Sequence, residues 1–119
     1  MKILFVENHA VFAATVVQQF LTAHSVTIVP GLEAACEALR TTTFDAALVD
    51  YDLDDGKGDE LVRELRQRQN ELLIIGVSSH EAGNTALLRA GVNAICGKME
   101  FDQIQKVLES AAQPACCGG

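Results

Sequence analysis

Polar residues that could bind a metal ion and a phosphoryl group stand after short apolar runs of the sequence. Glu7 and Asn8 follow the first run, Asp50 follows the third, and Ser78 and Lys98 come after the last two. Carboxylate and amide oxygens suit Mg²⁺, whose coordination is usually completed by waters and a substrate phosphate. A hydroxyl group and an ammonium group can contact that phosphate. These residues predict one site, provided that the fold gathers the ends of the runs at one edge.

The apolar runs are predicted to be β-strands because each is short and lies far from the next. They are Ile3–Val6, Val26–Val29, Ala46–Val49, Leu72–Val77 and Val92–Cys96. None of them alternates apolar with polar residues, which is typical of strands covered on both faces in a parallel sheet. Parallel neighbours must be joined by crossovers, so the segments between the runs are expected to be helices.

Apolar residues recur at helical spacing between and after these runs. The stripes are Phe12, Val16 and Phe20; Leu32, Ala35, Cys36 and Leu39; Leu61 and Leu65; and Phe101, Ile104, Leu108 and Ala111. A weaker helix is expected over Glu81–Ala90, with Gly91 at the position where a helix end favours glycine. Leu87 and Leu88 are adjacent in this helix, so they cannot both face the core.

Strand and helix alternate five times, which predicts an α/β fold. Right-handed crossovers then give a doubly wound five-stranded parallel sheet with helices on both faces. In one common arrangement the strand order is 2-1-3-4-5, and the first and third strands are neighbours where the winding reverses. Ligands bind beyond the carboxyl ends of the strands at that point, so Glu7, Asn8 and Asp50 are expected to converge.

Composition and charge exclude several other classes of function. Among 119 residues there are nine Lys and Arg against sixteen Asp and Glu, a net charge of −7, so direct nucleic-acid binding is not expected. No apolar run reaches the roughly 20 residues of a membrane span, and Glu7 interrupts the first run before a signal-peptide core could form. We therefore expect a cytoplasmic protein without membrane contact, whose four cysteines are free thiols.

Four motifs in this order and spacing resemble the response-regulator receiver domain of two-component signalling. They are Phe5–Asn8, Phe44–Leu53, Ile74–Ser79 and Gly91–Lys98. The resemblance covers nearly the whole chain and implies a flavodoxin-like three-layer sandwich. It assigns residues 1–112 to a receiver domain, and residues 113–119 are expected to be a disordered tail.

The resemblance implies that Asp50 accepts a phosphoryl group from a phosphohistidine of a histidine kinase or a histidine phosphotransfer protein. Its implied ligands and contacts are Glu7, Asn8, Asp50 and the backbone carbonyl of Asp52 for Mg²⁺, and Ser78, Ser79 and Lys98 for the phosphoryl group. Asp52 and His80 are expected to modulate the site. His9 lies at the same edge, where a histidine could tune the lifetime of the phosphate or bind a transition metal, but a lone loop histidine is expected simply to be exposed. Phosphorylation would switch contacts with a downstream protein, and a homodimer is left open. Apart from self-dephosphorylation, no conventional enzyme activity is expected.

Three residues depart from the family pattern. Asn8 stands where the family has an acidic metal ligand, which removes a negative charge and is expected to weaken Mg²⁺ binding. Met99 replaces the usual proline after the lysine, and Ile95 replaces the aromatic residue whose rotamer usually follows phosphorylation. These departures favour an alternative function, a degenerate receiver that acts as a phosphorylation-independent protein-interaction module.

A calcium-binding loop is the other alternative, because Asp50, Asp52 and Asp54 fall at the first, third and fifth positions of such a loop. The remainder of the loop does not fit. Asp55 replaces the glycine at the sixth position and Leu61 replaces the bidentate glutamate at the twelfth.

Overall fold

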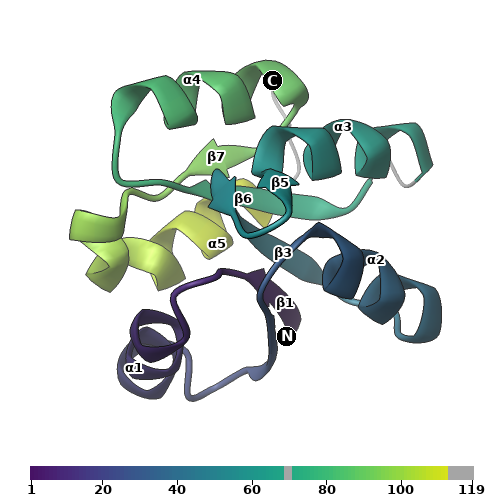
Figure 1. The fold of residues 1–119 in the computed structure, drawn as a ribbon. Helices are drawn as coiled ribbons and strands as arrows, with labels where there is room; N and C mark the ends of the chain where they lie inside the picture. Colours follow the sequence, from purple (N-terminus) through teal and green to yellow (C-terminus); the bar gives the residue numbers. More distant parts are fainter. Residues whose placement is uncertain (69–70, 113–119) are drawn as a thin grey trace, which may run out of the picture.

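A five-stranded parallel sheet forms the centre of the computed structural model, which describes residues 1–68 and 71–112 (Figure 1). Its strands are β1 (Lys2–Val6), β2 (Ser25–Val29), β3 (Ala46–Asp50), β6 (Leu73–Val77) and β7 (Ala94–Ile95). They lie in the order β2-β1-β3-β6-β7, and every neighbouring pair is parallel. Counted along the parallel strands, this is the predicted order 2-1-3-4-5, which is confirmed. The predicted tail lies outside the described residues.

Five α-helices and one short 3₁₀ helix cover the sheet. They are α1 (Ala10–Phe20), α2 (Leu32–Thr41), α3 (Gly58–Arg68), α4 (Glu81–Ala90), η1 (Lys98–Gln103) and α5 (Ile104–Ala112). Helix α4 has the predicted bounds and ends at Gly91, whose φ of 117° is in the left-handed region. The N–H of Gly91 donates to the carbonyl groups of Leu87 and Leu88, so the glycine closes the helix as expected. The last predicted helix is divided, since Phe101 lies in η1 and Ile104 begins α5.

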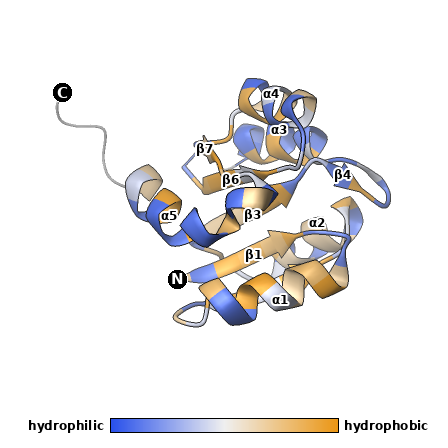
Figure 2. Cartoon of the chain, turned by 90° about the vertical axis from the view of Figure 1, so that its left-hand side faces the viewer, coloured by the Kyte–Doolittle hydropathy of each residue, from blue (hydrophilic) through white to orange (hydrophobic). Residues whose placement is uncertain are grey.

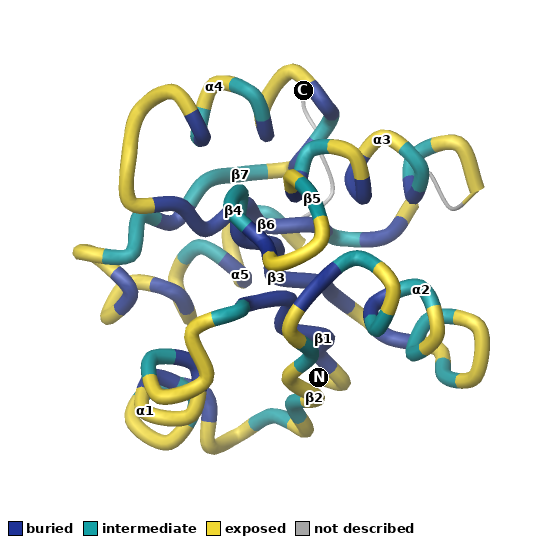
Figure 3. Tube along the Cα trace, in the orientation of Figure 1, coloured by how far each residue is buried: buried dark blue, intermediate teal, exposed yellow. Residues whose placement is uncertain are grey.

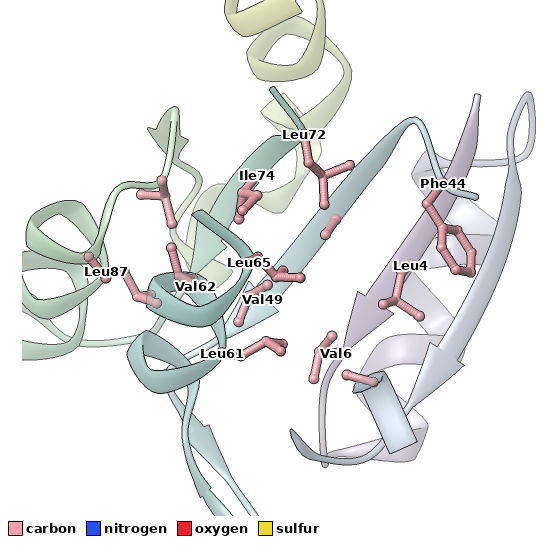
Figure 4. Packing of buried hydrophobic residues seen from close by; sticks show 14 of the residues in the cluster. Leu4, Val6, Phe44, Val49, Leu61, Val62, Leu65, Leu72, Ile74 and Leu87 are labelled. Atoms are coloured by element: carbon pink, nitrogen blue, oxygen red, sulfur yellow. The ribbon is translucent and has the colours of Figure 1, made fainter. Parts of the chain in front are cut away.

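The sheet separates two hydrophobic cores because successive residues of a strand point to opposite faces. Leu4, Val6, Ala47 and Val49 face α2, α3 and α4, and Figure 4 shows this core with Leu61, Leu65 and Leu87 of the helices pointing toward the strands. Ile3, Phe5, Ala46 and Leu48 face α1, η1 and α5. The central strands are therefore buried on both faces, as Figure 3 shows for β1 and β3, and Figure 2 shows that these strands are largely hydrophobic.

Two expectations about the strands were wrong. The second run was expected to be covered on both faces, but β2 is an edge strand, and three of its five residues are exposed. The fifth run was expected to extend over Val92–Cys96, but only Ala94 and Ile95 pair with β6. Edge position explains the first difference, because a terminal strand has a neighbour on one side only. In the fifth run, the backbone N–H groups of Asn93 and Cys96 still donate to Ile74 and Gly76 on either side of the two paired residues.

A second, two-stranded sheet was not predicted. Strands β4 (Asp52–Leu53) and β5 (Gly56–Lys57) form an antiparallel hairpin directly after β3. This hairpin projects beyond the carboxyl edge of the main sheet, beside the end of β3 (Figure 2). Within residues 1–68 and 71–112, no helix is long and apolar enough to cross a membrane.

Candidate functional site

The carboxyl ends of three adjacent strands gather the buried polar residues. Val6 pairs with Val49, and Asp50 pairs with Val77, so the residues after β1 and β6 stand beside the end of β3. Glu7, Asp50 and Ser78 are 1%, 3% and 2% exposed, and they are the buried polar or charged residues of the described chain. Burying charged groups is costly unless they are paired, so their collection at one edge marks a candidate functional site.

Lys98 supplies the counter-charge of this site. Its Nζ is 3.1 Å from Oδ2 of Asp50, and it is 3.1 and 3.2 Å from Oε1 and Oε2 of Glu7. The backbone N–H of Lys98 donates to the carbonyl oxygen of Ser78 at 3.2 Å, which ties the lysine to the end of β6. The ammonium group also lies 5.2 Å from the centre of the Phe12 ring, within the range of a cation–π contact.

The balance of charge at the site is negative, because one ammonium group faces two buried carboxylates. Burial, and after it the carboxylate of Glu7, raise the pKa of Asp50 to about 6, although Lys98 acts to lower it. Burial acts to lower the pKa of Lys98, but its bonds to Asp50 and Glu7 together raise it above the usual value. The site therefore favours an additional positive charge.

The residues after Glu7 differ in their contacts. Asn8 donates from Nδ2 to Oδ1 of Asp54 at 3.2 Å, and its Oδ1 is buried without a hydrogen bond to any described residue. His9 lies with Nδ1 3.0 Å from Oε2 of Glu7, and its backbone N–H donates to the same oxygen at 3.1 Å. Glu7, His9 and Asp50 each offer one ligand atom, and these atoms lie within 4.8 Å of one another. The sequence favoured an exposed loop histidine at position 9, and the structure shows an exposed side chain that also contacts the buried Glu7.

The hydroxyl side of the site is formed by the loop after β6. Oγ of Ser78 donates to the carbonyl oxygen of His80 at 3.2 Å and accepts from the N–H of the same residue at 3.3 Å. Ser78, Ser79 and Lys98 border one cavity of about 180 Å³. The structure therefore brings together the three residues that were expected to contact a phosphoryl group, with Ser79 exposed at the mouth.

The two expected modulators contact each other above the site. Nε2 of His80 is 3.1 Å from Oδ2 of Asp52, and Nδ1 of His80 accepts from the N–H of Gly83 at 3.1 Å. Because Nδ1 accepts, the ring proton stands on Nε2 and is donated to Asp52. Lys57, which sequence reasoning missed, lies with Nζ 2.5 Å from Oδ1 of Asp52. The bonds from Lys57 and His80 lower the pKa of Asp52.

The acidic loop does not form a calcium site. The carboxylate of Asp52 binds Lys57 and His80, whereas that of Asp54 binds Asn8. Asp55 faces the other way, and its carboxylate accepts the N–H groups of Leu32 and Glu33 at the start of α2 at 2.7 and 3.1 Å. The acids at the first, third and fifth positions of the supposed loop therefore bind different partners. Asp50 binds Lys98, Asp52 binds Lys57 and His80, and Asp54 binds Asn8.

Met99 does not prevent the lysine from reaching the site. Its side chain is exposed, while Lys98 beside it contacts both buried carboxylates. The residue at the proline position is therefore compatible with the expected place of the lysine. Ile95 is half-buried in β7 and packs against the core on the α4 side.

The fold and this edge define a doubly wound α/β domain with a buried acidic site at its topological switch point. Within that class, a sequence model described as "Response regulator receiver domain" matches residues 3–109. The chain therefore belongs to the response regulator receiver domain family of two-component signalling.

Individual relatives agree with the family. The sensor protein TorS of Escherichia coli K12 is 32% identical over 87 residues, which are 71% of this chain and 10% of the relative. The chain thus spans about a tenth of the length of that curated relative.

Two solved structures share the fold. The receiver domain of a sensor histidine kinase from Pseudomonas aeruginosa PAO1, with magnesium in its active-site cleft, has a TM-score of 0.80 and 23% identity, covering 92% of this chain and 94% of that one. TrrA of Thermotoga maritima, in complex with Mg²⁺-BeF, has a TM-score of 0.83 and 16% identity, with coverage of 92% and 97%.

Proposed function

We propose that this receiver domain accepts a phosphoryl group on Asp50 from a phosphohistidine of a protein partner and then changes its protein contacts. The observation that carries the proposal is the position of Asp50, buried at the end of β3 and 3.1 Å from Nζ of Lys98. Receiver domains interact with histidine kinases or histidine phosphotransfer proteins, and these are the proposed donors.

In the transfer, a carboxylate oxygen of Asp50 forms a bond to phosphorus as the bond from phosphorus to the histidine nitrogen breaks. The electron pair of the broken bond stays on the imidazole, which takes up a proton. Such transfers are catalysed mainly by positioning and by offsetting charge on the phosphoryl oxygens. Lys98 supplies a positive charge beside Asp50. The Ser78 hydroxyl makes only a long bond to a carbonyl oxygen and can exchange it for one to a phosphoryl oxygen.

The residues at this edge suit a divalent cation. The carboxylates of Glu7 and Asp50 and the unpartnered Oδ1 of Asn8 are hard oxygen donors of the kind that Mg²⁺ prefers, and the backbone carbonyl of Asp52 is the fourth donor in this proposal. When bound, Mg²⁺ would neutralise charge on the phosphoryl oxygens. The neutral amide of Asn8 leaves one negative charge fewer than an acid would, so we expect weaker Mg²⁺ binding than at an all-acid site.

Asp52 and His80 are proposed to set the lifetime of the acyl phosphate. Their contact joins the loop after β3 to the start of α4 across the mouth of the site. A closed contact of this kind restricts the approach of water to the phosphoryl group. His80→Ala is therefore expected to shorten the lifetime of the adduct without preventing its formation.

A second candidate function is a phosphorylation-independent interaction module. The contact of Asn8 with Asp54 favours it, because the amide at the acidic position is already engaged with the neighbouring loop. The two functions differ in one respect that can be measured directly, namely whether Asp50 becomes phosphorylated at all.

The test is the intact mass of the chain after incubation with Mg²⁺ and acetyl phosphate, beside the variants Asp50→Asn and Asn8→Asp. Asp102→Asn is the matched control, since it removes one carboxylate from an exposed position whose side chain bonds only to the neighbouring Gln103 among the described residues. One added phosphoryl group in the native chain and in the control, absent from Asp50→Asn, supports the proposal. An adduct in Asn8→Asp but not in the native chain supports the second candidate.

The proposed change of protein contacts on phosphorylation is tested on the same samples. Phosphorylated chain is expected to form a different set of protein contacts from unphosphorylated chain, with a change in affinity of about 1–3 kcal/mol. Sedimentation velocity with and without the phosphodonor measures whether a second copy of the chain is one of these partners. Equal sedimentation in both states excludes a phosphorylation-dependent homodimer.

A further inference from the structure

His9 adds a nitrogen donor to a site whose other donors are oxygens. Its Nδ1 is 3.0 Å from Oε2 of Glu7, and a ligand atom from each of Glu7, His9 and Asp50 lies within 4.8 Å of the other two. Ligands at about 2.1 Å from an octahedral ion stand about 3 Å apart when they are adjacent, which is the separation found between His9 and Glu7.

Other observations in the described chain also point to a cation. The Glu7 side chain is fully buried, and its Oε1, although 3.1 Å from Nζ of Lys98, makes no hydrogen bond among the described residues. Oδ1 of Asn8 is also buried without a partner in residues 1–68 and 71–112. The Glu7 oxygen is already paired with the Lys98 ammonium group, whereas the Asn8 oxygen is an unsatisfied buried acceptor, which is costly and which a bound ion would satisfy.

The imidazole of His9 is available to an ion. Its side chain is 65% exposed, so the ring can turn without disturbing the core. His9 stands at the N-cap position of α1, but its side chain makes no capping bond to the helix. Its hydrogen bonds to Glu7, from the ring and from the backbone, hold the residue beside the buried carboxylate and leave the helix independent of the ring.

We propose that this site binds a divalent first-row transition ion in preference to Mg²⁺, with the imidazole of His9 as one ligand. Imidazole suits transition metals, whereas Mg²⁺ prefers oxygen and retains its waters. A neutral amide at position 8 weakens the site for a hard ion, and a nitrogen ligand at position 9 strengthens it for a softer one. The inference rests on the proposed phosphoacceptor function for its use in the cell, but ion binding itself needs no phosphorylation.

Mn²⁺ is the probe, because electron paramagnetic resonance measures the concentration of free Mn²⁺ directly. Displacement of bound Mn²⁺ by added Mg²⁺ in the same sample gives the affinity for Mg²⁺. The native chain is compared with His9→Ala. His24→Ala is the matched control, since this histidine bonds to Gln105 at 2.8 Å in a different part of the molecule. We expect His9→Ala to lose about tenfold in Mn²⁺ affinity with Mg²⁺ affinity unchanged, and His24→Ala to change neither.

Pulsed electron paramagnetic resonance of bound Mn²⁺ tests directly whether an imidazole nitrogen is a ligand of the ion. Modulation from an imidazole ¹⁴N is expected in the native chain and in His24→Ala, and not in His9→Ala. The inference is overturned by absence of this modulation in the native chain, by failure to bind Mn²⁺, or by an equal loss of both ions in His9→Ala. The mass assay with Mg²⁺ separates this failure from that of the proposed function, because an adduct on Asp50 can form in either case.

Discussion

Asp50→Asn is expected to stabilise the fold at neutral and alkaline pH while it removes the phosphoacceptor. The asparagine side chain resembles the protonated acid in size and in charge. Burial and the neighbouring carboxylate of Glu7 raise the pKa of Asp50 from 3.8 to about 6, so the ionised form is disfavoured in the folded chain. Lys98 keeps a partner in the variant, since its Nζ still lies 3.1 and 3.2 Å from the Glu7 oxygens.

The sign and size of the effect follow from the two pKa values. A folded-state pKa above the unfolded value stabilises the protein below pH 3.8, and this contribution is lost as the pH rises through about 6. Two pKa units are worth about 3 kcal/mol of unfolding free energy. The advantage of Asp50→Asn over the native chain should therefore grow from less than about 1 kcal/mol at pH 4 to about 3 kcal/mol at pH 8.

Urea unfolding followed by far-ultraviolet circular dichroism measures this difference, since the chain has no tryptophan to report by fluorescence. The control Asp102→Asn removes the same charge from an exposed residue and should stay within about 0.5 kcal/mol of the native chain. An advantage of Asp50→Asn that is equal at pH 4 and pH 8 would refute the reasoning, because it would show that ionisation of Asp50 costs the fold nothing.

Four further substitutions test the packing of the fold and the capping of α2. Gly58→Ala should lower the unfolding free energy by about 1–3 kcal/mol, because a Cβ there would lie 1.9 Å from the carbonyl oxygen of Asp50; an unchanged urea midpoint would contradict this. Leu87→Ala should cost about 2–5 kcal/mol and Leu88→Ala less than about 0.5, since Leu87 is 0% and Leu88 53% exposed. Equal losses in calorimetry would show that this division of α4 is wrong. Asp55→Ala should speed hydrogen exchange of the first-turn amides of α2, whose N–H groups it accepts. Exchange at the native rate would mean that another group caps the helix.

Local sequence patterns predicted most of the fold. The bounds of α4 and its end at Gly91 follow from apolar spacing and from the backbone freedom of glycine, both of which act within a few residues. The strand order was predicted because parallel strands with helical crossovers have few right-handed arrangements. The sequence also predicted that Leu87 and Leu88 face different surroundings. Which of the two is buried depended on how α4 lies on the sheet.

The order of residues along the strands predicted the composition of the site. Glu7, Asp50 and Ser78 stand at the ends of β1, β3 and β6, and register alone places them side by side. Lys98 is two residues beyond the last expected strand, close enough in sequence to reach the same edge. These assignments needed no knowledge of loop conformation.

Contacts between loops were decided only by the tertiary structure. The bonds of Asp52 to Lys57 and His80 depend on the hairpin after β3. No pattern of apolar residues in the sequence predicted this hairpin. The capping of α2 by Asp55, 22 residues away from Glu33, depends on the same hairpin.

The sequence by itself therefore determined the strands, the helices between them and the acids, hydroxyl and lysine at the strand ends, because hydrophobic periodicity and chain direction are local properties. The strand order was predicted as one common arrangement of such elements. The tertiary structure decided the burial of Glu7 and Asp50 around one lysine and the approach of His9 to Glu7. These features depend on how side chains from separate strands and loops meet in three dimensions, and the raised pKa of Asp50 follows from them.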